Sequence, residues 1–485
     1  MYFRQLFDEK LAQYSYLIGC QATGEAIVID PERDIDRYIA LAEKEGFTIV
    51  AAADTHIHAD YLSGLREFAE RGIKVYASAE GGNDWQYEWL LKSDSYDYVL
   101  LRDGDSFKVG NIEFTAVHTP GHTPEHICYL VYDRGAGATE AMGVATGDFV
   151  FVGDLGRPDL LESAAGVEGV MEPSARLLYQ SVVNKFKQWP EFLQIWPAHG
   201  AGSACGKALG AVPTSTVGYE ARFNTAITMA EEGEDAFVRF ILAGQPEPPL
   251  YFGRMKVENR GGPRVLRTLP NPMLISAEEL KQLAGRLDIY IVDTRPWDDF
   301  KAGHVPGALS IPLTKSFSTH IGSFVEPGKP IYLIVDSFRL EEAIRDMIRI
   351  GLDDIVGYAT PEVMKHYANI PDAPLAKSPA ITIEELLELY KTGQVTHVLD
   401  VRTSAEYQTG HLPGALNIAH TRLATQVDRL PKTDAPIYVH CESGGRATAS
   451  ASFLERLGFN VVAVVGPFSK WVELGGPVER EELIA

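Results

Sequence analysis

A chain of 485 residues is too long for one hydrophobic core, and at about 150 residues per domain it predicts roughly three domains. Its 44 basic and 66 acidic residues give a net charge of −22, which disfavours nucleic acid and membranes as partners because both bind through basic patches. Without a signal-peptide pattern, a long apolar stretch or paired spacing of its four cysteines, the sequence indicates a reducing compartment, most simply the cytoplasm.

The first 205 residues predict successive strands with few helices between them. The strands are short apolar or alternating runs at 25–31, 47–56, 74–78, 106–119, 126–133 and 144–151. Helical patterns intervene at 34–46 and 174–189. From about 206 to 270 the chain is helical and then rich in Pro and Gly, which indicates an extension and a linker.

Histidine and aspartate residues cluster where these predicted strands end. In chain order they are His56, His58, Asp60, His122, Asp148 and His199. Metal ligands must be held by rigid elements, so an ordered set of this kind predicts a metal site. Asp154 is an alternative carboxylate to Asp148.

This succession resembles that of the metallo-β-lactamase superfamily, over the whole of the first domain. Dinuclear members such as glyoxalase II-type thioesterases have H-x-H-x-D-H, whereas Tyr61 stands here at the last position, and a phenol is a poor zinc ligand. The departure is compatible with the persulfide dioxygenase branch, which uses one iron. The segment GDFVFVGDLGRPDL, with Arg157 and Asp159, also resembles that branch, and the resemblance implies that Arg157 binds substrate.

The same resemblance implies how the metal is held. His56, His122 and Asp148 would form a two-His-one-carboxylate face for a single Fe(II), with positions left open for O2 and a substrate sulfur. Zn is the alternative metal. The residues that would orient the ligands, or replace them as alternative ligands, are His58, Asp60 and His199.

The cysteines of the first domain differ in what they predict. Cys205 follows His199 by six residues on a stretch of small residues. It is either an ordinary loop thiol or a catalytic one that reaches the metal site, where it would accept a persulfide sulfur or sense its oxidation. Cys20 and Cys128 lie in apolar strands and are predicted to be core residues.

A repeat dominates the second half of the chain. IYIVDTRPWDDFKAGHVPGALSIPL begins at Ile289, and HVLDVRTSAEYQTGHLPGALNIAH begins at His397. Each unit runs from a β-branched strand through a polar helix to a Gly-His-x-Pro-Gly-Ala turn, and a second apolar strand and an amphipathic helix follow. Strands that alternate with helices predict a parallel α/β sheet in each unit.

The second copy carries a reactive loop that the first copy lacks. Cys441 stands between a strand and a helix, where backbone N–H groups and the helix dipole stabilise a thiolate or persulfide. Gly444 and Gly445 let the loop curl around the sulfur, and Arg446 offers a positive fork to the oxyanion of sulfite or thiosulfate. This C-x-x-G-x-R loop resembles that of rhodanese domains. Val335 stands at the cysteine position of the first copy, which predicts an inactive domain.

The resemblances imply an α/β chain in three parts, a metallo-β-lactamase αββα sandwich followed by two rhodanese-like domains with central parallel sheets. The predicted boundaries are 1–270, 271–372 and 377–485. The arrangement resembles the bacterial fusion of a persulfide dioxygenase with an inactive and an active rhodanese domain.

That fusion implies a role in sulfide detoxification. A low-molecular-weight thiol persulfide would be oxidised by O2 to sulfite, and Cys441 would pass a sulfane sulfur to sulfite to give thiosulfate. We also expect a homo-oligomer, either a dimer or a tetramer. The alternatives are a dinuclear zinc thioester hydrolase of glyoxalase II type fused to a sulfurtransferase, and a sulfur-relay or sensor protein with a vestigial metal site.

Overall fold

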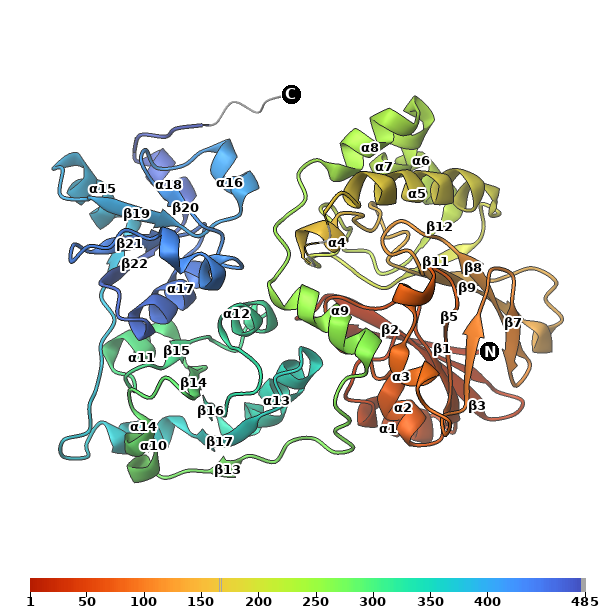
Figure 1. Cartoon of the computed structure of the whole chain (residues 1–485), viewed down its shortest axis with the longest axis horizontal. Coiled ribbons are helices and arrows are strands. Elements are labelled where there is room, and N and C mark those ends of the chain that lie inside the picture. The colour runs from red at the N-terminus through yellow and green to blue at the C-terminus, as the bar shows by residue number, and fades with distance from the viewer. Residues whose placement is uncertain (165, 167, 481–485) are drawn as a thin grey trace. The chain divides into compact units, whose positions relative to one another are not determined.

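The computed structural model of the protein describes residues 1–164, 166 and 168–480 (Figure 1). The chain forms two compact units, one of Met1–Thr268 with Ile348–Gly351 and the other of Leu269–Met347 with Leu352–Ala485. Among the described residues, no helix is both long and apolar enough to cross a membrane.

The first unit is built on two six-stranded sheets. The order in the first sheet is β1 (Tyr2–Asp8), β2 (Gln13–Cys20), β3 (Glu25–Ile29), β4 (Thr48–Ala53), β5 (Lys74–Ser78) and β6 (Tyr98–Leu101). The order in the second is β12 (Ser215–Thr216), β11 (Gln194–Pro197), β10 (Gly143–Gly147), β9 (Ile127–Asp133), β8 (Ile112–His118) and β7 (Ser106–Val109). Both sheets mix parallel and antiparallel pairs.

The two sheets pack face to face because their strands alternate apolar side chains between two buried faces. On β3, Ile27 and Ile29 join the core between the sheets, which also contains Phe114 and Tyr129 of the second sheet. Ala26 and Val28, which alternate with the two isoleucines along the strand, point to the opposite face and pack under helices. A strand buried on both faces reads as the continuous apolar run seen in the sequence.

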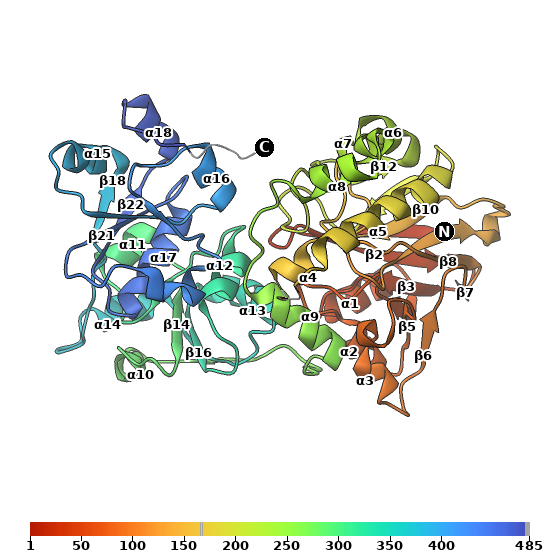
Figure 2. The ribbon, with the colours of Figure 1, turned by 45° about the horizontal axis from the view of Figure 1, so that its top comes forward.

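Helices cover both outer faces. The first sheet is covered by α1 (Asp36–Lys44), α2 (Leu65–Glu70) and α3 (Glu88–Leu91). The second is covered by α5 (Met171–Asn184), α6 (Val217–Phe223), α7 (Thr225–Met229) and α8 (Glu234–Leu242), and Figure 2 shows α5 running along this sheet. Two further helices are α4 (Leu160–Ser163) and α9 (Tyr251–Gly261). The result is the expected αββα sandwich.

The second unit contains two five-stranded parallel sheets with one topology. The first has the order β13 (Met273–Leu274), β17 (Ile355–Ala359), β16 (Ile331–Ile334), β14 (Tyr290–Asp293) and β15 (Leu309–Ser310). The second has the order β18 (Ala380–Thr382), β22 (Val461–Val465), β21 (Ile437–His440), β19 (His397–Asp400) and β20 (Leu416–Asn417). Strand for strand the two orders are the same, which confirms the repeat and the parallel sheets.

The helices of this unit also repeat. Those of the first copy are α10 (Ala277–Leu283), α11 (Trp297–Ala302), α12 (Phe317–Phe324), α13 (Leu340–Arg349) and α14 (Pro361–Tyr367). Those of the second are α15 (Ile383–Lys391), α16 (Ser404–Thr409), α17 (Gly445–Arg456) and α18 (Phe468–Glu473). The repeated Asp and Arg are structural: Arg295 pairs with Asp293 at 2.6 Å, and Arg402 pairs with Asp400 at 2.7 Å.

Candidate functional site

Three residues from separate loops of the first unit meet in its interior. His56 follows β4, His122 follows β8 and Asp148 follows β10, and one ligand atom from each lies within 4.8 Å of the others. Asp148 Oδ2 is 3.4 Å from Nε2 of His122 and 4.0 Å from Nε2 of His56. All three side chains are buried. The structure therefore brings together the three residues expected to bind metal.

Each of the three histidines around Asp148, namely His56, His122 and His199, is held through Nδ1. His122 Nδ1 donates to the carbonyl of Arg157 at 2.9 Å, and His199 Nδ1 donates to the carbonyl of Ala12 at 3.2 Å. His56 Nδ1 lies 2.9 Å from the hydroxyl of Thr55. A carbonyl accepts only from a protonated nitrogen, so Nε2 of His122 and of His199 carries the lone pair. That nitrogen is the one directed at Asp148.

The cluster contains buried polar atoms that the described protein groups do not satisfy. Neither carboxylate oxygen of Asp148 has a hydrogen-bond partner among the described residues, and the same is true of Asp60 Oδ2 and His199 Nε2. Such atoms destabilise a fold unless something else binds them. Neutral imidazoles and carboxylates suit Fe or Zn, so the residues fit a bound divalent metal.

Burial sets the charge states that this fit requires. It lowers the pKa of His56 and of His122 well below the ordinary histidine value, with the neighbouring cations adding to the effect. It also raises the pKa of the Asp148 carboxyl to about 6. Both imidazoles are therefore neutral at physiological pH, which is the form that binds a metal.

A second group of possible ligands adjoins the first. Atoms of Asp60, His199 and Cys205 lie within 4.8 Å of one another. His199 Nε2 is 3.4 Å from Asp60 Oδ2 and equally far from Asp148 Oδ1, so it links the two groups. The Cys205 thiol thus reaches the cluster, and burial raises its pKa well above the ordinary thiol value.

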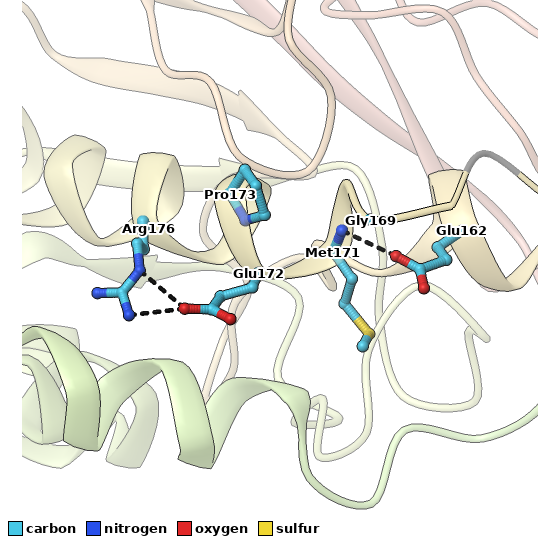
Figure 3. Close-up of a pocket in the computed structure, with 6 residues that line it drawn as sticks. All are labelled: Glu162, Gly169, Met171, Glu172, Pro173 and Arg176. Carbon is cyan, nitrogen blue, oxygen red and sulfur yellow. Dashed lines mark hydrogen bonds and ion pairs between the residues drawn. The ribbon is translucent and has the colours of Figure 1, made fainter.

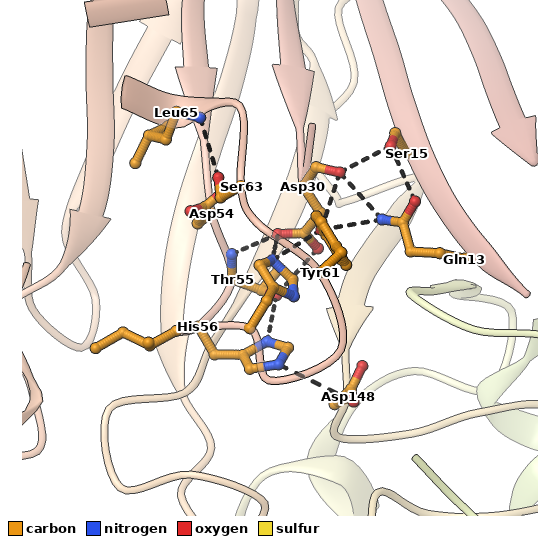
Figure 4. Close-up of polar contacts among 12 residues, drawn as sticks. Gln13, Ser15, Asp30, Asp54, Thr55, His56, Tyr61, Ser63, Leu65 and Asp148 are labelled. Carbon is orange, nitrogen blue, oxygen red and sulfur yellow. Dashed lines mark hydrogen bonds and ion pairs between the residues drawn. The ribbon is translucent and has the colours of Figure 1, made fainter. Parts of the chain in front are cut away.

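His58 has a different position from the other histidines. Its Nε2 lies 3.2 Å from Asp30 Oδ1 and 3.1 Å from the hydroxyl of Tyr61. Figure 4 shows Tyr61 beside Asp30 and Gln13, to which its hydroxyl is hydrogen-bonded. Burial alone would lower the pKa of His58, but the charge of Asp30 raises it to about 9. The Tyr61 hydroxyl also accepts a hydrogen bond from Gln13. Tyr61 is therefore committed to supporting His58 and does not complete the Asp60 group.

Gly147 lets these loops approach closely. Its φ is +51°, in the left-handed region, and a Cβ at this position would lie 2.5 Å from the hydroxyl of Thr55 and 2.6 Å from a ring nitrogen of His126. Only glycine fits such a place without displacing its neighbours. The turn that carries Asp148 therefore depends on the Thr-Gly-Asp sequence.

Two neighbouring residues of the Asp148 turn have structural partners. Asp154 accepts hydrogen bonds from the backbone N–H groups of Leu155, Lys207 and Ala208, which removes it as an alternative ligand. Arg157 pairs with both carboxylate oxygens of Asp159 and also donates to two backbone carbonyls. These contacts indicate a structural role for a side chain that was expected to bind substrate.

Helix α9 contributes residues that the sequence analysis did not identify. The amide nitrogen of Asn259 donates to the carbonyls of His58 and Tyr61, and its oxygen accepts from the N–H of Ser63. Lys256 is 9% exposed, and its ammonium lies 4.5 Å from the ring centroid of Trp85. Burial lowers its pKa to about 8, against the opposing charges of Glu125 and Asp148. No local pattern in the linker-like sequence signals either residue.

In the second unit, Cys441 follows β21 and precedes α17. The backbone N–H of Gly444 donates to its sulfur at 3.1 Å. Gly444 adopts a φ of +106°, which favours glycine, and Gly445 begins the helix. The thiol is buried. The loop is therefore curled around the sulfur, as the glycines led us to expect.

Arg446 has a partner that the loop sequence does not reveal. Its Nη1 and Nη2 each lie 2.7 Å from a carboxylate oxygen of Glu406 on α16. The bidentate pair compensates the arginine charge. The guanidinium is therefore held in an internal ion pair, and its contact with a substrate oxyanion stays a prediction.

The first copy has no thiol at the equivalent position. Asp293 of β14 pairs with Ile334 of β16, and Asp400 of β19 pairs with His440 of β21. This register makes Val335 the structural counterpart of Cys441. Without a thiol there, this copy carries no sulfane sulfur.

A surface depression near α5 contains none of the candidate ligands. Its lining residues are Glu162, Gly169, Met171, Glu172, Pro173 and Arg176 (Figure 3). Arg176 is paired with Glu172 at 2.7 Å and with Asp235 at 3.0 Å, so its charge is compensated. The depression is therefore not a competing candidate site.

Comparison with known proteins assigns both halves of the chain. Residues 9–199 match the Metallo-beta-lactamase superfamily, and residues 276–357 and 382–474 match the Rhodanese-like domain. A crystal structure titled metallo-beta-lactamase, from Staphylococcus aureus subsp. aureus COL, is 40% identical, with a TM-score of 0.66. The match covers 74% of this chain and 99% of that one.

Two curated relatives match the first unit. Persulfide dioxygenase ETHE1, mitochondrial, of Bos taurus is 28% identical over 234 residues, which cover 47% of this chain and 77% of the relative. The cytoplasmic hydroxyacylglutathione hydrolase of Arabidopsis thaliana is 32% identical over 189 residues, which cover 38% of this chain and 63% of the relative. The first unit is thus similar to enzymes of two different reactions.

Proposed function

Because the chain belongs to the metallo-beta-lactamase superfamily and continues into two rhodanese-like domains, we propose that it is an iron persulfide dioxygenase coupled to a sulfurtransferase. The reaction would be R–S–SH + O2 + H2O → R–SH + SO₃²⁻ + 2 H⁺, with a low-molecular-weight thiol as R–SH. Thiosulfate would form from sulfite at Cys441, and the role would be sulfide detoxification. The similarity to a persulfide dioxygenase supports the first reaction.

The convergence of His56, His122 and Asp148 is the observation on which the proposal rests. These residues would hold the metal, since their ligand atoms lie close together and both carboxylate oxygens of Asp148 are buried without a hydrogen-bond partner among the described residues. A bound iron(II) ion would supply the redox chemistry with dioxygen. The chain's own residues keep the imidazoles neutral and correctly oriented, through burial and through the carbonyl of Arg157.

Lys256 gives this site a positive charge for its substrate. At physiological pH its ammonium is mostly protonated, because burial lowers its pKa only to about 8. Its apolar stem is buried, and its ammonium faces the ring of Trp85. A hydropersulfide is more acidic than a thiol and is anionic near neutral pH, so Lys256 would attract the sulfur end of the substrate.

The sulfurtransferase half uses Cys441 as a sulfur carrier. The N–H of Gly444 donates to its sulfur, and the N-terminus of α17 adds the positive end of a helix dipole. Both stabilise the thiolate that is released when the outer sulfur leaves. The first rhodanese-like copy, with Val335 at this position, would not take part as a carrier.

A thioester hydrolase is the alternative, and two observations favour it. Asp60, His199 and Cys205 form a second set of possible ligands beside the first, as a dinuclear site requires. The similarity to a hydroxyacylglutathione hydrolase points the same way. Against it, the hydroxyl of Tyr61 is bonded to His58 and Gln13.

Oxygen uptake by anaerobically prepared, iron-loaded protein tests the proposal. With glutathione persulfide or coenzyme A persulfide we expect uptake and thiosulfate when a second persulfide is available. His122→Ala should lose both metal and uptake, whereas Cys441→Ser should keep uptake and release sulfite instead of thiosulfate. Two bound zinc ions, thioester cleavage and no uptake would move the chain to the hydrolase.

A further inference from the structure

The helix that follows the Cys441 loop packs on the first rhodanese-like copy. Phe453 of α17 stacks on Phe324 of α12, with ring centroids 4.9 Å apart. The hydroxyl of Ser452 accepts a hydrogen bond from the backbone N–H of Ser310, at 2.9 Å. Arg456 donates to the carbonyls of Gly307 and Ile289, among others. The two copies therefore share one interface, and α12 lies beside α17 in both views (Figures 1 and 2).

Two histidines meet at this interface, one from each copy. His320 lies on α12 of the first copy, and His420 follows β20 of the second. Their ring centroids are 5.3 Å apart, with the rings nearly perpendicular. Both side chains are buried, and each is 7% exposed. A pair of buried imidazoles is an unusual way to fill an apolar contact, because each ring carries a donor and an acceptor that burial leaves to be satisfied.

The pair has unused hydrogen-bonding capacity. His420 Nδ1 is buried and has no hydrogen-bond partner among the described residues. Burial lowers the pKa of both imidazoles, that of His320 to about 4, and the positive charge of Arg446 lowers them further. Both rings are therefore neutral, and each offers one N–H donor. Backbone hydrogen bonds place His420 at the same edge of the sheet as the Cys441 loop. Its N–H donates to the carbonyl of Val401, and the N–H of Val401 donates to the carbonyl of His440, the residue before Cys441.

The reaction needs donors that the loop itself does not supply freely. In the transfer step, sulfite attacks the outer sulfur of Cys441–S–S⁻. A bond forms between the sulfur of sulfite and the outer sulfur of the persulfide. The bond between the outer sulfur and Sγ breaks, and its electron pair stays on Sγ, so the products are Cys441–S⁻ and S₂O₃²⁻. The charge is −3 on both sides. The three oxygens of sulfite must be held, yet Glu406 compensates the charge of Arg446.

We propose that the first rhodanese-like copy, although it has no thiol, supplies His320 to the Cys441 site, where His320 and His420 donate to the oxyanion of sulfite or thiosulfate. The ligand class is a sulfur oxyanion, and neutral N–H donors bind it without adding a net charge. The inference rests on the proposed sulfur transfer at Cys441. It gives the copy without cysteine a direct part in the chemistry.

Three variants of the full-length chain separate hydrogen bonding from packing. His320→Phe keeps an aromatic ring opposite His420 but removes the donor, whereas His320→Gln keeps an N–H donor. His366→Phe, an exposed histidine of the same copy, is the matched control. The assay is sulfur transfer from thiosulfate to cyanide, with KM and kcat determined separately.

We expect His320→Phe to raise the KM for thiosulfate about tenfold, the equivalent of one lost hydrogen bond, with a smaller change in kcat. His320→Gln should recover most of the loss, and His366→Phe should match the wild type. A second readout needs no turnover: sulfite should protect Cys441 from alkylation by iodoacetamide, and this protection should weaken in His320→Phe.

The two possible failures are distinguishable. If the wild type transfers no sulfur, the proposed sulfurtransferase function itself fails. If the wild type is active and His320→Phe retains both its KM and the protection by sulfite, the role of His320 is refuted while the sulfurtransferase stands. An equal rise in the KM for thiosulfate in His320→Phe and His320→Gln would also refute it, because it would indicate that packing matters rather than hydrogen bonding.

Discussion

Thr55 sets the tautomer of His56. Its hydroxyl donates to Asp30 Oδ2 at 3.0 Å, and the same oxygen lies 2.9 Å from His56 Nδ1. A hydroxyl whose only hydrogen is used in this way can meet the imidazole only as an acceptor. His56 Nδ1 is therefore the protonated nitrogen, and Nε2 carries the lone pair that faces Asp148. The hydrogen-bonded chain from Asp30 through Thr55 therefore orients a candidate metal ligand.

Thr55→Val should therefore weaken metal binding. Valine keeps the shape but cannot accept from His56, so the ring loses the contact that fixes its tautomer and orientation. We expect the metal affinity to fall by about 10- to 100-fold, measured by competition with a chelator. Thr216→Val, which removes the N-cap of α6, is the control. Equal affinities of Thr55→Val and the wild type would contradict this role of the threonine.

Asn259 on α9 should be needed for the stability of the loop that carries His56, which is called the metal loop below. Asn259→Ala would leave the carbonyls of His58 and Tyr61 and the N–H of Ser63 buried without their partner. Each buried unpaired group destabilises by about 1–3 kcal/mol, and a water that enters the space offsets part of the loss. We expect a loss of about 2–4 kcal/mol for the first unit, measured by urea unfolding.

The control for this prediction is Asn369→Ala. Asn369 is exposed, and its amide donates to the carbonyl of Lys365 on the preceding helix, α14. It should change the free energy of unfolding by less than about 0.5 kcal/mol. An Asn259→Ala variant as stable as this control would mean that α9 does not support the metal loop.

The convergence of the candidate metal ligands could be predicted from the sequence because each of these residues follows a strand. His56, His122 and Asp148 all stand where an apolar run ends, and strand ends meet at one edge of a sandwich. Lys256 and Asn259 could not be predicted in this way. Asn259 lies about 200 residues from the loop that it contacts, and Lys256 lies 171 residues from Trp85. Both stand on a helix preceded by prolines that are typical of a linker. A contact at that separation leaves no local periodicity to detect.

The Cys441 loop shows the same limit at a shorter range. The glycines and their conformation follow from the loop sequence itself, since only glycine adopts the φ of Gly444 readily. The partner of Arg446 does not, because Glu406 lies forty residues earlier on another helix. Arg446 read alone predicts an anion-binding fork. Read with Glu406, it is half of an ion pair.

That ion pair should make the stability of the last domain depend on pH. Burial alone would raise the pKa of Glu406, but the hydrogen bonds and charge of Arg446 lower it to about 2. Because the folded pKa lies below the unfolded value of about 4.3, the stabilisation is complete above that value and is lost as the pH falls toward 2. Glu406→Gln should therefore be less stable than the wild type at pH 7, with the difference shrinking below about pH 4.

The expected difference at pH 7 is about 1 kcal/mol, since both side chains are partly exposed, at 22% and 34%. Urea unfolding at pH 7, 5 and 3.5 measures it. Glu388→Gln removes the exposed pair of Glu388 with Lys391 on α15 and should change little at any pH. A difference in the free energy of unfolding between Glu406→Gln and the wild type that stays constant across this pH range would contradict the lowered pKa of Glu406.

Lys256 should affect substrate binding more than the chemical step. Lys256→Met removes the ammonium but keeps an unbranched apolar stem against Trp85, so the helix has little reason to unfold. We expect the KM for an anionic persulfide to rise about tenfold with kcat within about threefold, because a charge that attracts the substrate acts equally before and during reaction. Lys256→Arg should restore most of the affinity, since it restores the charge.

Lys207→Met is the matched control for this last prediction. Lys207 also lies over an aromatic ring, at 4.2 Å from the centroid of Phe240, but its ammonium donates to the carbonyls of Phe240 and Ala243. Its loss should lower stability without changing KM. If Lys256→Met and Lys256→Arg both lowered kcat and left KM unchanged, the lysine would instead act on the reacting atoms. The attraction of the persulfide anion would then have to come from the metal alone.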